Sequence, residues 1–209
     1  MMSPVFLKRD DNGKAMIKLI EATNTVSEQK KRIHPHKFTL WIAIGSIIMM
    51  FAGLTSAYIV KRDQPGWTTF DMPRTFLLST AVILLSSLTI QIALKSFRER
   101  KMDRYRGFIT VTAILGLVFV ALQWVGFTQI WDSGITFRGS GAGQFLFVIA
   151  GLHALHVIGG VIALLVMFVK AYRTNVRSYN VVPVEVVASY WHFVDILWIY
   201  LLIFFLLVQ

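Results

Sequence analysis

The sequence contains no cysteine, and only 15% of its 209 residues are charged. The missing cysteines exclude disulfides, thiolate nucleophiles, iron–sulfur clusters, cysteine-based zinc sites and covalently attached c-type haem. Ordinary soluble domains contain about 25% charged residues, whereas 56% of this chain is apolar and its mean hydropathy is +0.62. A soluble fold of this length could not bury so much apolar surface. The composition therefore predicts a membrane protein and argues against a soluble enzyme.

Five stretches are apolar and long enough to cross a bilayer as helices, which takes about 20 residues each. They cover residues 38–60, 75–94, 107–127, 144–169 and 184–208. All 21 Lys and Arg residues fall outside these spans, and only the fifth span contains acidic residues, Glu185 and Asp195. We therefore predict an all-α integral membrane protein, with a five-helix membrane domain over residues 34–209 and a basic cytoplasmic tail over residues 1–33.

The basic residues alternate from one side of the predicted membrane to the other. The N-terminal segment contains eight, the second connection six and the fourth three, which makes 17, against four in the first and third connections. Because basic residues concentrate on the cytoplasmic side, the N-terminus is predicted inside and Gln209 outside. The net charge of +10 is thus mainly a topology signal. It is divided among loops, so it does not predict nucleic-acid binding.

Polar residues interrupt the last two spans, where a buried charge costs several kcal/mol unless it is paired or hydrated. His153 and His156, three residues apart in the fourth span, share one helix face, and Gly159 and Gly160 follow a turn later. The fifth span contains a polar stripe flanked by two tryptophans: Glu185, Ser189, His192 and Asp195, with Trp191 and Trp198.

A helical rise of about 1.5 Å per residue places His156 roughly 20 Å, Asp195 about 16 Å and His192 about 12 Å from the inner ends of their helices. We therefore expect a buried hydrogen bond between Asp195 and His156 across two antiparallel helices. A bis-histidine haem site needs two imidazoles at one depth. By this count His156 lies about 8 Å above His192, so the depths disfavour a haem site. A metal site, and a proton relay through Glu185, His192 and Asp195, are alternatives to a structural or lipid-facing role.

The first two spans contain residues suited to contacts between helices. We expect the hydroxyl groups of the second span to bond to neighbouring helices or to the preceding turn, and consecutive helices to be neighbours because the loops are short. His34 and His36 are expected at the membrane surface as anchors or subunit contacts. The small residues of the first span, which would admit another helix closely, are Gly45, Ala52, Gly53, Ser56 and Ala57. The hydroxyl set is Ser79, Thr80, Ser86, Ser87 and Thr89.

Two long motifs carry a family resemblance. GLHALHVIGG at residues 151–160, followed by YWHFVDILWIYLL at residues 190–202, resembles the signature of subunit III of haem–copper terminal oxidases. FAGLTSAY at residues 51–58 and LQW at residues 122–124 fit as well. The likeness covers about residues 34–209, and it is to the five-helix form of the family.

The resemblance implies an accessory, non-catalytic subunit in a bacterial-type cell (inner) membrane. It would pack beside catalytic subunit I, with subunit II and small subunits as further partners, in a complex that reduces dioxygen to water and pumps protons. Haem and copper would lie in the partner subunits, and this chain would bind phospholipid, sustain proton uptake and stabilise the large subunit. A respiratory supercomplex is a further possible partner. By motif, His153, His156, Tyr190, Trp191, His192, Asp195 and Trp198 would have structural or lipid-binding roles.

The sequence departs from the family pattern at two places. Many members have a membrane-buried, carbodiimide-reactive Glu where this chain has Ile47, and another Glu where it has Gly126. A proton-related role that depends on those carboxylates should not be carried over. Three alternatives stay open: a subunit-III-like partner of nitric oxide reductase, an independent proton or ion carrier, and a small b-type haem protein. The sequence does not decide between cytochrome c and quinol as the electron donor.

Overall fold

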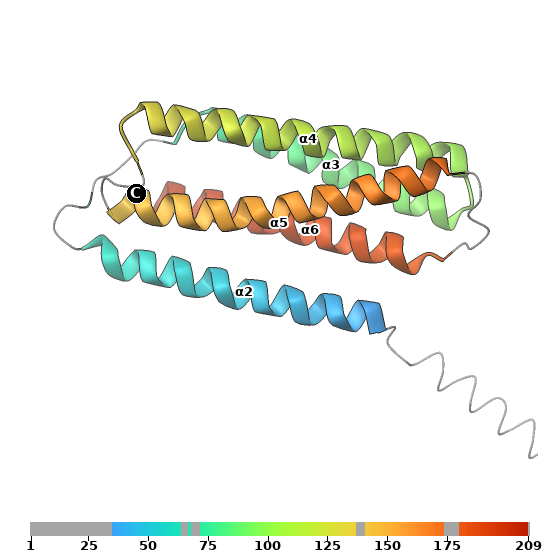
Figure 1. The fold of residues 1–209 in the computed structure, drawn as a ribbon, viewed down its shortest axis with the longest axis horizontal. Helices are drawn as coiled ribbons and strands as arrows, with labels where there is room; N and C mark the ends of the chain where they lie inside the picture. Colours follow the sequence, from blue (N-terminus) through green and yellow to red (C-terminus); the bar gives the residue numbers. More distant parts are fainter. Residues whose placement is uncertain (1–34, 64–66, 68–71, 137–140, 174–179, 209) are drawn as a thin grey trace, which may run out of the picture. The chain divides into compact units, whose positions relative to one another are not determined.

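The computed structural model describes residues 35–63, 67, 72–136, 141–173 and 180–208, and the described chain contains five α-helices. All five are long and apolar enough to cross a membrane, which confirms the predicted all-α, five-span architecture of a multi-pass membrane protein. Residues 39–209 belong to one compact unit. The predicted tail, residues 1–33, lies outside the described residues. The helices are α2 (Pro35–Arg62), α3 (Thr75–Arg98), α4 (Met102–Asp132), α5 (Gly141–Tyr172) and α6 (Val182–Leu207) (Figure 1).

The helices begin earlier or end later than the apolar runs. α4, for example, begins at Met102 rather than at residue 107 and so includes Asp103, Arg104 and Arg106. Charged side chains at a span end can reach the interfacial water while the backbone continues as a helix. The described helices therefore extend beyond the apolar runs that hydropathy located.

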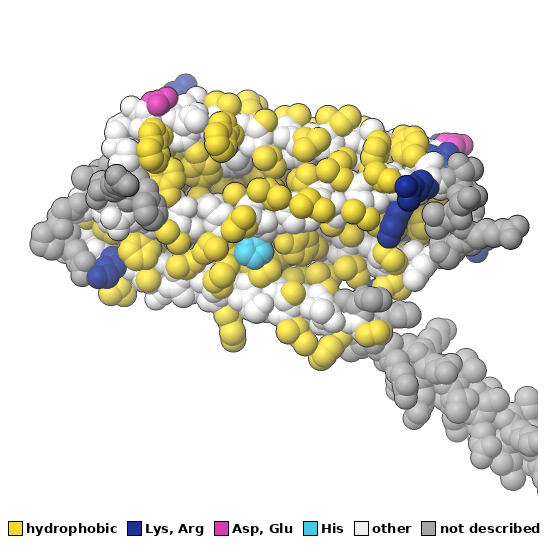
Figure 2. Space-filling model, viewed as in Figure 1, with side chains coloured by type: hydrophobic (Ala, Val, Ile, Leu, Met, Phe, Trp, Pro, Cys, Tyr) yellow, Lys and Arg dark blue, Asp and Glu magenta, His cyan; other side chains and the backbone are white. Residues whose placement is uncertain are grey.

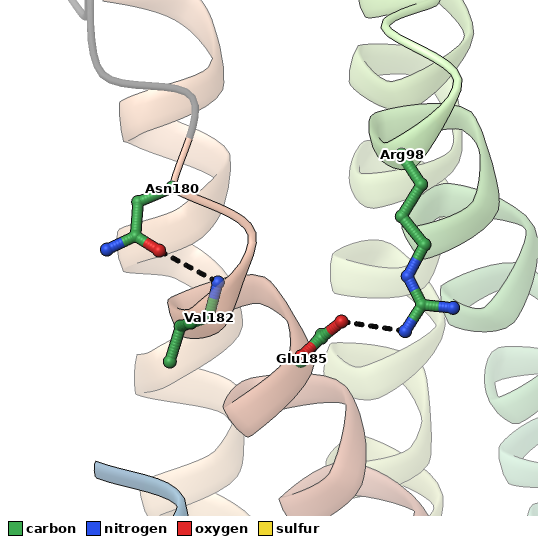
Figure 3. Close-up of polar contacts among 4 residues, drawn as sticks. All are labelled: Arg98, Asn180, Val182 and Glu185. Carbon is green, nitrogen blue, oxygen red and sulfur yellow. Dashed lines mark hydrogen bonds and ion pairs between the residues drawn. The ribbon is translucent and has the colours of Figure 1, made fainter. Parts of the chain in front are cut away.

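Local sequence explains where two helices end or begin. After α3 the backbone of Arg100 adopts φ 58°, and the Lys101 N–H donates to the Ser96 carbonyl at 3.0 Å. This left-handed residue reverses the chain into α4 within residues 99–101. At the start of α6, Asn180 Oδ1 accepts from the Val182 N–H at 3.0 Å and Pro183 occupies the first turn (Figure 3).

Four of the helices pack closely: α3 on α4, α4 on α5, α5 on α6 and α6 back on α3. From Thr39 onward, no Cα atom of α2 comes within 8 Å of a Cα atom of another described helix. The expectation that consecutive helices are neighbours is therefore correct for three pairs and wrong for α2 and α3. The short turn at residues 99–101 holds α3 against α4, whereas the longer connection at residues 63–74 lets α2 lie beside α5 and α6 instead (Figure 1).

Aromatic and branched side chains fill the interior of the four packed helices. Phe76, Phe119, Leu146 and Trp191 are each at most 1% exposed. The outward faces are also apolar, and Figure 2 shows hydrophobic side chains along the helices with Lys and Arg towards their ends. Such a surface suits a bilayer, because lipid tails are as apolar as the side chains that face them.

Candidate functional site

The hydroxyl groups of α3 connect it to two other helices. We call Ser79, Thr80, Ser86, Ser87 and Thr89 the α3 hydroxyl ladder. Towards α4, Gln123 Nε2 donates to Ser79 Oγ at 3.1 Å, and the Thr89 and Thr112 hydroxyls bond at 2.8 Å. Towards α6, the ladder meets Trp198, Trp191 and His192. This confirms the expectation that the hydroxyl set of the second span bonds to neighbouring helices.

The two tryptophans of the α6 motif are interior packing residues with satisfied N–H groups. Trp191 Nε1 donates to Ser86 Oγ at 3.1 Å, and Trp198 Nε1 donates to Thr80 Oγ1 at 3.0 Å. The Trp191 ring fits against Gly116 and Gly160, where an added Cβ would lie 3.0 Å from the ring. The missing side chain at Gly160 thus leaves room for the Trp191 ring between α5 and α6.

His153 is a buried packing residue in α5. Its ring stacks on Trp198 with the centroids 5.4 Å apart and an interplanar angle of 28°, and it meets the edge of Phe51 at 6.4 Å. Both ring nitrogens are buried and have no hydrogen-bond partner among the described residues. Its aromatic neighbours enclose this imidazole, which does not face a second histidine across a shared ligand position.

The predicted hydrogen bond between Asp195 and His156 is wrong. His156 Nδ1 lies 2.7 Å from the Leu152 carbonyl oxygen, and its ring packs 5.9 Å from Phe51 of α2. The contacts of His153 with Trp198 and of Gly160 with Trp191 place His156 and Asp195 at similar heights. Helical rise therefore predicted the relative heights of the two residues correctly. It does not specify the direction in which each side chain points around its helix axis, and these two side chains point to different neighbours.

Asp195 faces the α3 side of the bundle. Its carboxyl group is buried, at 2% exposure for the residue, and both oxygens lack a hydrogen-bond partner in the described part of the chain. The Ser87 hydroxyl is engaged with His192 Nδ1 at 2.6 Å, and His192 lies three residues before Asp195 on the same face of α6. Asp195, Ser87 and His192 therefore form a small polar group between α3 and α6.

Glu185 is set apart from that group. It pairs with Arg98 through Oε1 and Nη2 at 2.7 Å, close to the end of α3 and the beginning of α6 (Figure 3). Ser189, the next member of the predicted stripe, is exposed, whereas Asp195 is buried. The stripe thus divides into an ion pair at the helix ends and a polar group in the interior.

The described residues do not bring three or more metal-ligating side chains together. His153 packs on Trp198, His156 faces the Leu152 carbonyl and His192 bonds to Ser87. His153 and His156 share Phe51 as a neighbour, but the polar partners of the three imidazoles differ, so these residues do not fit the metal site considered from the sequence. The geometry suits fixing helices against one another.

The comparisons with known proteins agree with the motifs. The sequence model of the family described as cytochrome c oxidase subunit III matches residues 37–208. The chain belongs to this family. A probable cytochrome c oxidase subunit 3 of Nocardia farcinica is 30% identical over 180 residues, 81% of this chain and 89% of the relative. A probable quinol oxidase subunit 3 of Staphylococcus aureus strain USA300 is 26% identical over 185 residues, 86% and 92% of the two chains. The resemblance found in the sequence is thereby confirmed.

In this subunit III chain, long side chains connect α2 to α5 and α6. Thr55 Oγ1 and the Tyr200 hydroxyl bond at 2.9 Å, and Phe51 packs against His153 and His156. Tyr58, fully buried, meets Phe204 at 5.3 Å. This face was not predicted from the sequence, although positions 51, 55 and 58 of the FAGLTSAY motif follow the spacing of one helix face.

The small residues of α2 point elsewhere. Gly45 and Gly53 have no atom within 4 Å of an added Cβ, and Ala52 and Ser56 are exposed. Among the described helices, none uses this face for close packing. The expectation that these residues admit another helix closely is therefore not met within the described chain.

The two positions without a family carboxylate have apolar surroundings. Ile47 is half-buried and packs on the core of the bundle. Gly126 is buried against Phe76, and an added Cβ would lie 2.8 Å from that ring, so a larger residue would not fit. The predictions for His34 and for the side chain of His36 fall outside what the structure describes.

Proposed function

We propose that this chain is an accessory, non-catalytic membrane subunit of a haem–copper respiratory oxidase. Catalytic subunit I and subunit II are its expected partners, and small subunits or a supercomplex could join them. The complex would reduce dioxygen to water and pump protons, with haem and copper in the partner subunits. The observation that carries the proposal is the family match over residues 37–208.

The interior contacts support a structural role for the motif residues. Tyr190 donates to the His156 carbonyl at 3.0 Å, and the Trp191 and Trp198 N–H groups bind the α3 hydroxyl ladder. A buried N–H without a partner costs a membrane protein several kcal/mol, so these bonds hold α3, α5 and α6 in one register. In this proposal the chain acts as a rigid body that stabilises the catalytic subunit.

Phospholipid binding is part of the proposal. α2 reaches α5 and α6 through side chains rather than through close backbone packing, and its apolar side chains are exposed, including Trp41 and Met49. Acyl chains suit surfaces of this kind. We propose that lipid held there supports proton uptake by subunit I. Carboxylates at positions 47 and 126 have no part in this proposal, because this chain has Ile47 and Gly126 there.

We also propose the orientation and the location. The 17 basic residues of the N-terminal segment and of the second and fourth connections, against four elsewhere, favour a cytoplasmic N-terminus and an external C-terminus in a bacterial-type cell membrane. A cysteine introduced at Asp132, near the predicted outer end of α4, should react with a membrane-impermeant maleimide in intact cells. A cysteine at Arg100 should react only after lysis, and the reverse pattern would reject the orientation.

The association is tested by tagging the chain and purifying it in a mild detergent. We expect a haem–copper catalytic subunit to co-purify, with its haem absorption and with phospholipid in a fixed ratio. Recovery of a nitric oxide reductase large subunit would instead support the related family. Recovery of the chain alone, with proton or ion transport in liposomes or with its own haem band, would reject the accessory role.

Substrate oxidation by the purified complex identifies its electron donor. One relative is named a cytochrome c oxidase subunit and another a quinol oxidase subunit, so both reduced cytochrome c and a reduced quinol should be supplied. If the complex oxidises only one of the two, that substrate is its electron donor. The assay uses the whole complex because the electron entry sites belong to other subunits.

A further inference from the structure

We propose that Asp195 is a neutral carboxylic acid that holds one proton inside the helix bundle and communicates with His192 through the Ser87 hydroxyl group. This protonation site goes beyond the structural role proposed above for the motif. It involves α3 and α6 only, so it can be tested apart from the association of the chain with a catalytic subunit.

The Asp195 carboxyl group is isolated from water and, among the described residues, from hydrogen-bond donors. The residue is 2% exposed, and neither carboxyl oxygen has a hydrogen-bond partner in the described part of the chain. A carboxylate is an acceptor with about four lone-pair positions, and burying one without donors is far more costly than burying the neutral acid. The neutral form also has an O–H group that can donate a hydrogen bond.

The Asp195 carboxyl group also lies far from positive charge. All Lys and Arg residues lie outside the predicted spans, and the nearest basic residue of α3, Lys95, is about 12 Å along the helix from Ser87. Arg98 is further along and pairs with Glu185. The histidines of α5 lie in the same interior, and their rings pack against Phe51 and Trp198 rather than against a basic residue.

Ser87 lies beside the face of α6 that contains His192 and Asp195. Its Oγ is 2.6 Å from His192 Nδ1, and Asp195 follows three residues later on the same helix face. In the proposed state the Asp195 O–H turns to donate to Ser87 Oγ, a bond that the described part of the chain does not contain, while the Ser87 O–H donates to Nδ1. If the proton moves, the Asp195 O–H bond breaks, Ser87 accepts that proton and gives its own to Nδ1. A carboxylate and an imidazolium result, with the total charge unchanged, and the apolar surroundings return the proton to Asp195.

Infrared difference spectroscopy of the purified complex tests this site. The carbonyl stretch of a protonated, desolvated carboxylic acid should be present in the wild type at neutral pH and lost in Asp195→Asn. Glu185→Gln is the matched control, because Glu185 is ion-paired with Arg98 and should contribute no such band. A wild type that shows no difference from Asp195→Asn in this spectral region, or a band lost in the control instead, would overturn the proposal.

Ser87→Ala provides a second readout that does not require the aspartate to be replaced. Removing the hydroxyl acceptor should move the carbonyl band to higher frequency while the band persists. An unchanged frequency would show that Ser87 does not contact the acid and would reject the connection to His192. If the chain failed to co-purify with an oxidase while the band behaved as predicted in the chain itself, the proposed function would fail and this site would stand.

Discussion

α2 and α3 are both apolar helices of similar length, yet they are held in the protein by different means. α3 packs directly on α4 and α6 and bonds to both through its hydroxyl ladder. α2 contacts α5 and α6 through side chains, including Phe51, Thr55 and Tyr58, while from Thr39 onward its Cα atoms stay more than 8 Å from those of the other described helices. The comparison teaches that apolar character inserts a helix in the membrane, whereas close approach and polar contacts fix its position.

The largest difference should come from replacing a tryptophan in each region. Trp191→Ala would remove a fully buried ring and its bond to Ser86, and should lower the free energy of unfolding by about 3–5 kcal/mol. Trp41→Ala on α2, where the ring is 64% exposed, should change it by less than about 0.5 kcal/mol. Denaturant unfolding in detergent micelles measures both, and equal losses would show that α2 is packed as firmly as the bundle.

A glycine pair sharpens the same comparison. Gly126→Leu would press on Phe76, whose ring is confined by Phe127 and Trp198, and should cost about 1–3 kcal/mol through overpacking. Gly53→Leu on α2 enters open space and should be neutral or slightly stabilising. Thermal unfolding of both variants in the same detergent measures the two changes in stability. A neutral Gly126 variant would mean that α3 and α4 can separate easily.

The polar link of α2 is expected to be weaker. Thr55 and Tyr200 bond at 2.9 Å, and a double-mutant cycle with Thr55→Val and Tyr200→Phe should give a coupling of about 0.6 kcal/mol, the average for side-chain hydrogen bonds in membranes. The free energy of unfolding of the four proteins provides the cycle. Coupling near zero would leave α2 held by its aromatic contacts alone.

The smallest effect should be that of the ion pair at the helix ends. The Arg98 and Glu185 side chains are 57% and 20% exposed, so water screens their attraction. A cycle with Arg98→Gln and Glu185→Gln should give a few tenths of a kcal/mol, and the coupling should disappear in high salt. A large coupling that salt leaves unchanged would indicate that this pair is buried in the assembled protein.

The sequence was sufficient to predict the five helices, because length and apolar composition determine where a spanning helix can form. It also placed His156 and Asp195 at similar heights along α5 and α6. The partner of His156 could not be predicted, because depth along two helices says nothing of rotation about their axes. The Leu152 carbonyl, one turn away on the same helix, was the available acceptor.

The position of α2 was the other error. Short loops predict that consecutive helices are neighbours. The rule fails for α2 and α3, which are joined by the longer connection of residues 63–74. The small residues of α2 suggested close packing, but packing depends on the face that meets the neighbours, and that face contains Phe51, Thr55 and Tyr58. Spacing alone does not distinguish a face used inside the chain from one left at its surface.

The central claim, that this subunit III chain supports a catalytic partner without holding the redox centres, is tested by removing it from the purified oxidase. We predict that the depleted complex keeps its full haem and copper content and its initial rate of dioxygen reduction, and then loses activity faster during turnover. Loss of haem or copper in proportion to the chain removed would contradict the claim.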